Sequence, residues 1–205
     1  MPDILSQLFS SDALIKIMRL FLLNPEEIFD LRDVCRRTKI SLKNVRRELK
    51  LLSNIEFIRS SVHEEEIQLR GKHKTRKKKI EGWRLNSQFS LLPHLKVLIL
   101  DTTPIDRDKL LYRFNDLGSR LKLVMISGIF LDDENSRVDM LIVGDSISRS
   151  RLERILSSIE AELGKEIKYA VFSTDEFLYR VNMYDHFIRD ILNAPHEKLL
   201  NKFDA

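Results

Sequence analysis

Apolar residues in the first quarter of the chain recur every three to four positions, which is the spacing of one face of an α-helix. Ser11 and Asp12 are suited to cap such a helix, and Asn24-Pro25 is suited to end it. The apolar stripe between these signals consists of Leu14, Ile17, Met18, Phe21 and Leu22. The pattern therefore predicts a first long helix.

Two further helices are predicted downstream. The stretch from Leu31 to Arg37 has a short apolar face, and the turn Thr38-Lys39-Ile40 follows it. Ser41 is a good N-cap for a helix from Leu42 to Ser53. The apolar stripe of this helix is Leu42, Val45, Leu49 and Leu52. Its opposite face, which we expect to be exposed, carries Lys43, Asn44, Arg46, Arg47 and Lys50.

A β-hairpin follows the third helix in the predicted order. Residues from Phe57 to Val62 and from Ile80 to Leu85 read as its strands. The long connection between them contains the acidic run 64–66 and the basic run 72–79. The mostly apolar run from Phe89 to Leu100 is predicted to be a connecting helix, with Pro93 tolerated near its start.

The second half of the chain alternates helices and strands. We expect helices at 106–117, 148–163 and 174–192 and strands at 121–130, 136–143 and 166–172. The predicted fold class is α+β. Residues 1–88 form three helices and a hairpin, 89–104 connect, and 105–205 form a small α/β domain.

The two halves of the chain differ in their balance of charged residues. Residues 1–90 carry 19 Lys and Arg against 12 Asp and Glu, whereas the remainder carries 16 against 19. The basic first half suggests a polyanionic partner. A single cysteine excludes an internal disulfide and suits a reducing cytoplasm, and no apolar run is long enough to predict a membrane span.

The predicted third helix and hairpin carry side chains suited to duplex DNA. In a helix-turn-helix the second helix enters the major groove, where Arg, Lys and Asn reach base edges or phosphates. Candidate contacts in this helix are Ser41, Lys43, Asn44, Arg46, Arg47 and Lys50. Candidate phosphate contacts in the hairpin are Lys72, His73, Lys74, Arg76, Lys77, Lys78 and Lys79.

Each of these features also has a simple structural explanation, because charged helix faces and lysine-rich loops are usually just solvated. Their occurrence in this order favours DNA binding. Residues 9–86 resemble the winged helix domain of prokaryotic ArsR-like transcriptional regulators in Phe9-Ser10-Ser11, Leu23-Asn24-Pro25, 29–34, 45–49 and 83–86. Metal-sensing members carry cysteine pairs, and Cys35 stands alone, so we expect neither a metal nor a cofactor.

The second half resembles the minimal nucleotidyltransferase fold in 137–145, 162–169 and 173–177, with Arg180 and Phe187. The resemblance implies a Gly-Ser turn for phosphates and an Asp-x-Asp pair for magnesium. In this chain the Gly-Ser turn appears in reverse order, as Ser127-Gly128, and the Asp-x-Asp pair is replaced by Arg137-Val138-Asp139. A cation in place of a metal-binding carboxylate opposes metal binding, so these four residues, Ser127, Gly128, Arg137 and Asp139, are interpreted as a vestigial site and the protein as no enzyme.

The sequence therefore predicts a DNA-binding transcriptional regulator whose second domain is a sensor or association module. An active nucleotidyltransferase and an antitoxin-like protein-binding module are the alternatives. Because helix-turn-helix proteins usually bind paired half-sites, we expect a homodimer on double-stranded DNA, with a possible protein partner for the second domain. The apolar helix 89–100 is the candidate dimer surface, and burial between the two domains is the equal alternative.

Overall fold

The computed structural model describes residues 4–68, 75–101, 107–131, 133 and 135–203, without the side chains of 63–68, 75–78 and 101. The chain is of mixed α and β structure, with 55% helix and 20% strand. It divides into two compact units, the first comprising 1–103 with 160–165 and the second 104–159 with 166–205.

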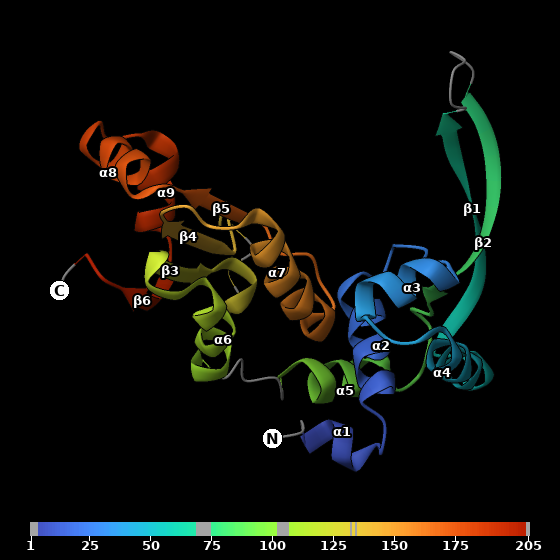
Figure 1. Cartoon of the computed structure of the whole chain (residues 1–205). Coiled ribbons are helices and arrows are strands. Elements are labelled where there is room, and N and C mark those ends of the chain that lie inside the picture. Colours follow the sequence, from blue (N-terminus) through green and yellow to red (C-terminus); the bar gives the residue numbers. More distant parts are fainter. Residues whose placement is uncertain (1–3, 69–74, 102–106, 132, 134, 204–205) are drawn as a thin grey trace. The chain divides into compact units, whose positions relative to one another are not determined.

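Four helices open the first unit (Figure 1): α1 (Ile4–Leu8), α2 (Asp12–Leu23), α3 (Leu31–Thr38) and α4 (Leu42–Asn54). Ser11 caps α2 as expected, since its hydroxyl oxygen accepts a 3.1 Å hydrogen bond from the backbone N–H of Leu14. Between α3 and α4 the chain turns at Lys39, which adopts the left-handed conformation with φ 58°. The predicted helices are confirmed to within about a residue at each end.

Strands β1 (Ile58–Gln68) and β2 (Thr75–Leu85) form an antiparallel hairpin (Figure 1). The expectation that 64–66 and 76–79 belong to the connecting loop is wrong, because both lie in strands. Backbone pairing propagates along the hairpin beyond the segments in which apolar residues mark it. Phe29 adds a short third pairing with Trp83, through N···O distances of 3.0 and 2.9 Å. Gly82 permits this approach, since a Cβ there would lie 2.6 Å from the carbonyl oxygen of Phe29.

Helix α5 (Leu92–Lys96) and the π-helical turn Val97–Asp101 belong to the first unit. Ile99 is fully buried in its core, and four more apolar residues of this segment pack on that core: Phe89, Leu92, Leu95 and Leu100. This core also contains Ile17, Phe21, Val45, Leu49, Leu52 and Phe57. The apolar side of the segment predicted as a connector therefore covers the helices of its own unit.

The second unit is a four-stranded sheet with helices. The elements are α6 (Arg107–Arg113), β3 (Leu121–Ser127), β4 (Met140–Gly144), α7 (Arg149–Leu163), β5 (Tyr169–Phe172), α8 (Thr174–Asn182), α9 (His186–Asn193) and β6 (His196–Asn201). Short 3₁₀ helices, Phe114–Arg120 and Gly128–Phe130, precede and follow β3. The strand order is β5-β4-β3-β6, in which only β4 and β5 run parallel, and α7 forms their crossover (Figure 1).

Several predictions for this unit were wrong. The strands predicted at 136–143 and 166–172 begin only at Met140 and Tyr169. The predicted helix 174–192 is two helices, because Tyr184 has a left-handed φ of 53° and Asp185 caps the next helix by accepting from the N–H of Ile188. The strand predicted to end at 130 ends at Ser127, since Gly128 (φ 56°) turns the chain. Strand β6 was not predicted, and it pairs with β3.

Both faces of the central strands are buried. Leu123, Met125, Leu141 and Val143 share a core with Phe177 of α8 and with Ile188 and Ile191 of α9. The alternate residues Val124, Ile126, Met140 and Ile142 are at most 2% exposed. Among the described residues, no helix combines the length and apolar character needed to cross a membrane.

Candidate functional site

Helix α4 presents one polar and largely cationic face to solvent. Val45, Leu49 and Leu52 are buried beneath it, as the stripe predicted. The side chains on the other side are all exposed: Ser41, Lys43, Asn44, Arg46, Arg47 and Lys50. The helix thus brings four cations and an amide together at the surface, directly after the turn at Lys39.

The start of α4 differs from the expectation in two respects. Ser41 is the N-cap residue, yet its side chain makes no capping hydrogen bond. Leu42, expected in the buried stripe, is 45% exposed. A first-turn residue has no preceding helical turn beside it, so helical spacing alone does not decide its burial. The N-terminal amides of α4, which bear partial positive charge, thus lie beside exposed polar residues.

A buried carboxylate that was not predicted from the sequence lies behind this face. Glu48 is only 4% exposed, and its Oε1 accepts a 3.0 Å hydrogen bond from the hydroxyl of Ser11. Arg47 donates to the same oxygen from Nε at 3.1 Å and from a terminal nitrogen at 2.6 Å. Arg47 is therefore anchored on one side, while its side chain remains 68% exposed. Helical spacing places Glu48 on the buried stripe, three residues after Val45 and four before Leu52. It was not predicted to be buried because a glutamate in a helix is ordinarily solvated.

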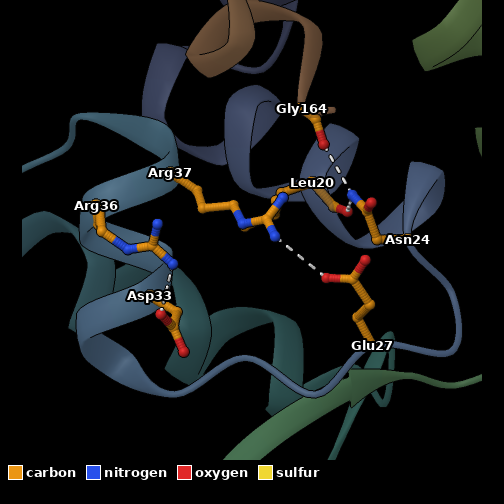
Figure 2. Close-up of polar contacts among 7 residues, drawn as sticks. All are labelled: Leu20, Asn24, Glu27, Asp33, Arg36, Arg37 and Gly164. Carbon is orange, nitrogen blue, oxygen red and sulfur yellow. Dashed lines mark hydrogen bonds and ion pairs between the residues drawn. The ribbon is translucent and has the colours of Figure 1, made fainter. Parts of the chain in front are cut away.

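Two of the three arginines of α3 have structural partners (Figure 2). Arg36 donates to Asp33 at 2.9 Å, within the helix. Arg37, whose side chain is only 18% exposed, pairs with Glu27 at 3.4 Å. It also lies over the ring of Phe29. Arg32, the third, is exposed, as are Lys39 and the cations of α4.

The hairpin residues are placed only in part. Lys72, His73 and Lys74 lie outside the described residues, and for Arg76, Lys77 and Lys78 only the backbone of β2 is described. Lys79 is exposed. The backbone register sets Lys79, Lys78 and Lys77 opposite Glu64, Glu65 and Glu66 in turn. The last three residues of the basic run, 77–79, are therefore paired in register with the acidic run 64–66, which was not expected from the prediction of a loop.

The predicted vestigial residues of the second unit come together around one turn. Ser127 ends β3 and is buried, with its hydroxyl donating to the carbonyl of Val138 at 2.6 Å. Gly128 follows with φ 56°, and a Cβ on it would lie 2.2 Å from Oδ1 of Asp139. This close approach explains why glycine occupies the position.

Both carboxylate oxygens of Asp139 accept backbone hydrogen bonds at this turn. Its Oδ1 accepts from the backbone N–H of Ile129 at 2.9 Å, and its Oδ2 accepts from that of Lys168 at 2.8 Å. The residue is 5% exposed and lies just before β4 rather than on it. Arg137 points instead to an ion pair with Asp190, at 2.7 Å, and is 59% exposed. The arrangement links two loops through the carboxylate of Asp139.

The described part of the chain contains no cluster of three or more His, Cys, Asp or Glu side chains that could hold a metal ion. Cys35 packs against the core of the first unit, and its burial raises the pKa of the thiol. No family model matches the chain, and neither a curated protein nor a solved structure matches it.

Proposed function

We propose that the protein is a DNA-binding transcriptional regulator, with a winged helix-turn-helix of the ArsR-like kind in residues 1–88. The observation that carries the proposal is the exposed polar face of α4, which follows α3 after a short turn and precedes a hairpin. This is the order in which helix-turn-helix proteins place a recognition helix and a wing. The partner is double-stranded DNA, and the place of action is the cytoplasm.

Within α4 we assign different roles to the exposed side chains. Lys43 and Asn44 lie in the first turn, the part of a recognition helix that approaches base edges, and Asn pairs well with adenine. Arg46 projects from the same face, whereas Lys50 is one turn further and suits a phosphate. Arg47 is held by Glu48, so we expect it to contribute less than Arg46.

We propose further that the second unit is a nucleotidyltransferase-like domain without catalytic activity, acting as a sensor or association module. Support comes from Asp139, both of whose carboxylate oxygens already accept backbone hydrogen bonds. Each oxygen is thus already engaged in holding the turn, and Arg137 stands where the Asp-x-Asp pattern would place the other carboxylate ligand. Incubation with labelled ATP and magnesium should give no nucleotide incorporation; incorporation abolished by Asp139→Ala would refute this part.

DNA binding is tested by selecting bound duplexes from a random pool and then titrating salt. Asn44→Ala and Arg46→Ala should each lower the affinity for the selected duplex about tenfold or more. Asn44→Ala should also relax the base preference at one position of the site. Lys50→Ala should lower the affinity for all duplexes alike and reduce the slope of log K against log salt by about one. Arg151→Ala, an equally exposed cation on α7, is the matched control and should change nothing. Equal affinities for wild type and the three α4 variants would refute the proposal.

A further inference from the structure

Strand β5 has one unpaired edge. It forms one end of the sheet and pairs only with β4, in parallel, from Met140 opposite Tyr169 to Val143 opposite Phe172. Within the described residues no strand lies on its other side. An open strand edge presents a row of backbone donors and acceptors to another chain.

The opposite end of the sheet is protected in ways that β5 is not. Strand β6 contains Glu197 and Lys198, and its pairing with β3 is irregular between Val124 and Met125. Arg107 of α6 forms an ion pair with Glu197. Charges, irregular pairing and a covering helix are the usual means of blocking an edge. Strand β5, Tyr-Ala-Val-Phe, has no charge, no proline and a regular register.

The side chains on one face of β5 are also exposed. Tyr169 is 40% exposed and Val171 37%, although their β4 neighbours Met140 and Ile142 are fully buried. Aromatic and β-branched residues are among the most favourable cross-strand partners in a sheet. The open edge and the exposed apolar side chains thus occur on the same short strand.

The backbone pattern defines which residues face outward. In a strand the N–H and C=O of one residue point to the same side, and the side alternates along the chain. Lys168 faces β4, since its carbonyl accepts from the N–H of Asp139 at 2.6 Å and its N–H donates to the carboxylate of Asp139. Tyr169 and Val171 therefore direct their backbone groups to the open edge.

We propose that β5 pairs antiparallel with β5 of a second copy of this chain, about a two-fold axis through Ala170. Tyr169 of each copy then lies opposite Val171 of the other, so the outward backbone groups pair and all four exposed apolar side chains meet.

Lys168 falls opposite Phe172 of the second copy, near the exposed Asp175 in the first turn of α8. Arg180, which lies over the ring of Phe172, is already ion-paired with Glu176 and Asp185. Lys168 and Asp175 therefore approach as opposite charges at both ends of the pairing.

The proposal provides the homodimer that the proposed DNA binding calls for, but its test involves no DNA, so either can fail without the other. Sedimentation equilibrium of the full chain should give twice the 24.2 kDa chain mass. Tyr169→Lys and Val171→Lys should each weaken dimerisation at least about tenfold, because they set a charge in the apolar pair. Val62→Lys, an exposed valine of β1 at 54%, is the matched control and should leave the dimer intact.

Cross-linking tests the register and does not depend on disruptive variants. In the proposed pairing the two Ala170 residues are directly opposite and not hydrogen-bonded to each other, with Cα atoms about 4.5 Å apart, within disulfide range. With Cys35 replaced by Ala, Ala170→Cys should form an intermolecular disulfide on mild oxidation, and Val171→Cys should not. A monomeric wild type, a dimer that survives both lysine variants, or absence of the Ala170→Cys cross-link would overturn the proposal.

Discussion

Asn24 and Gly164, which are 140 positions apart, are joined by a hydrogen bond of 2.8 Å from the amide Nδ2 to the glycine carbonyl (Figure 2). The same nitrogen donates to the carbonyl of Leu20 at 2.7 Å, so it also closes the end of α2. Arg19, which is 5% exposed, donates to the carbonyls of Ile99 and Glu162. The last turn of α7 is in this way built into the first unit.

We expect Gly164→Ala to destabilise the first unit. The glycine has φ 80°, and a Cβ would lie 2.7 Å from backbone atoms of Arg19 and Leu20, which cannot move aside as a side chain could. Strain and overpacking together should cost about 2–4 kcal/mol in unfolding free energy. Gly118→Ala is the control for backbone strain alone: its φ is 64° and its ψ −149°, but a Cβ there would meet nothing. Denaturant titration should show a loss of about 1–3 kcal/mol in unfolding free energy for this variant, less than for Gly164→Ala. Equal losses in the two variants would mean that the close contact is not made.

Removing the buried carboxylate under α4 should cost more than removing its arginine. Glu48→Ala leaves the hydroxyl of Ser11 and the guanidinium of Arg47 without their acceptor, and we expect a loss of about 2–3 kcal/mol in unfolding free energy. Arg47→Ala removes a solvent-exposed partner and should cost less than about 1 kcal/mol. Thermal and urea unfolding measure both, and the reverse ranking would contradict the assigned roles.

We predict that Asp139 stabilises the folded chain. Asp139→Asn turns an NH₂ group toward one of two backbone donors, at Ile129 or Lys168, and should lower the unfolding free energy by about 2–3 kcal/mol. Arg137→Ala, which loses an exposed ion pair with Asp190, should cost less than about 1 kcal/mol. Circular dichroism during denaturant titration compares the two variants. An unchanged unfolding midpoint for Asp139→Asn would contradict the stabilising role of this carboxylate.

The carboxyl of Asp145 should titrate below the ordinary aspartate range. The backbone N–H of Thr174 donates to it at 3.0 Å and the threonine hydroxyl at 2.8 Å, and these two bonds, in that order, lower its pKa. A pKa lower in the folded state gives a stabilisation present above the unfolded-state pKa and lost as pH falls through the folded one. In Thr174→Val the pKa of Asp145, followed by carboxyl NMR, should rise only part of the way to the ordinary aspartate value, because the backbone hydrogen bond, which lowers it most, remains. A pKa that does not move would exclude a role for the hydroxyl.

Local pattern by itself determined three helices of the first unit, α2, α3 and α4, but not α1, and it determined the cap at Ser11 and the exposed face of α4. These features depend on neighbours within a turn or two, and helical spacing and capping residues record such neighbours directly. The same holds for the two strand segments where apolar residues lie near the base of the hairpin. Strands β3, β4 and β5 of the second unit were also predicted, although with different ends.

Tertiary structure decided the features that depend on distant segments. The burial of Glu48 requires Ser11, and the need for glycine at 164 arises only from the backbone of α2. Strand β6 exists because β3 offers it an edge, and its own sequence, with Glu197, Lys198 and Asn201, has no strand-like alternation. The pairing of 64–66 with 77–79 follows from a register set far from those residues. The sequence does not indicate which segments are partners in these contacts, because the segments involved meet only in the folded chain.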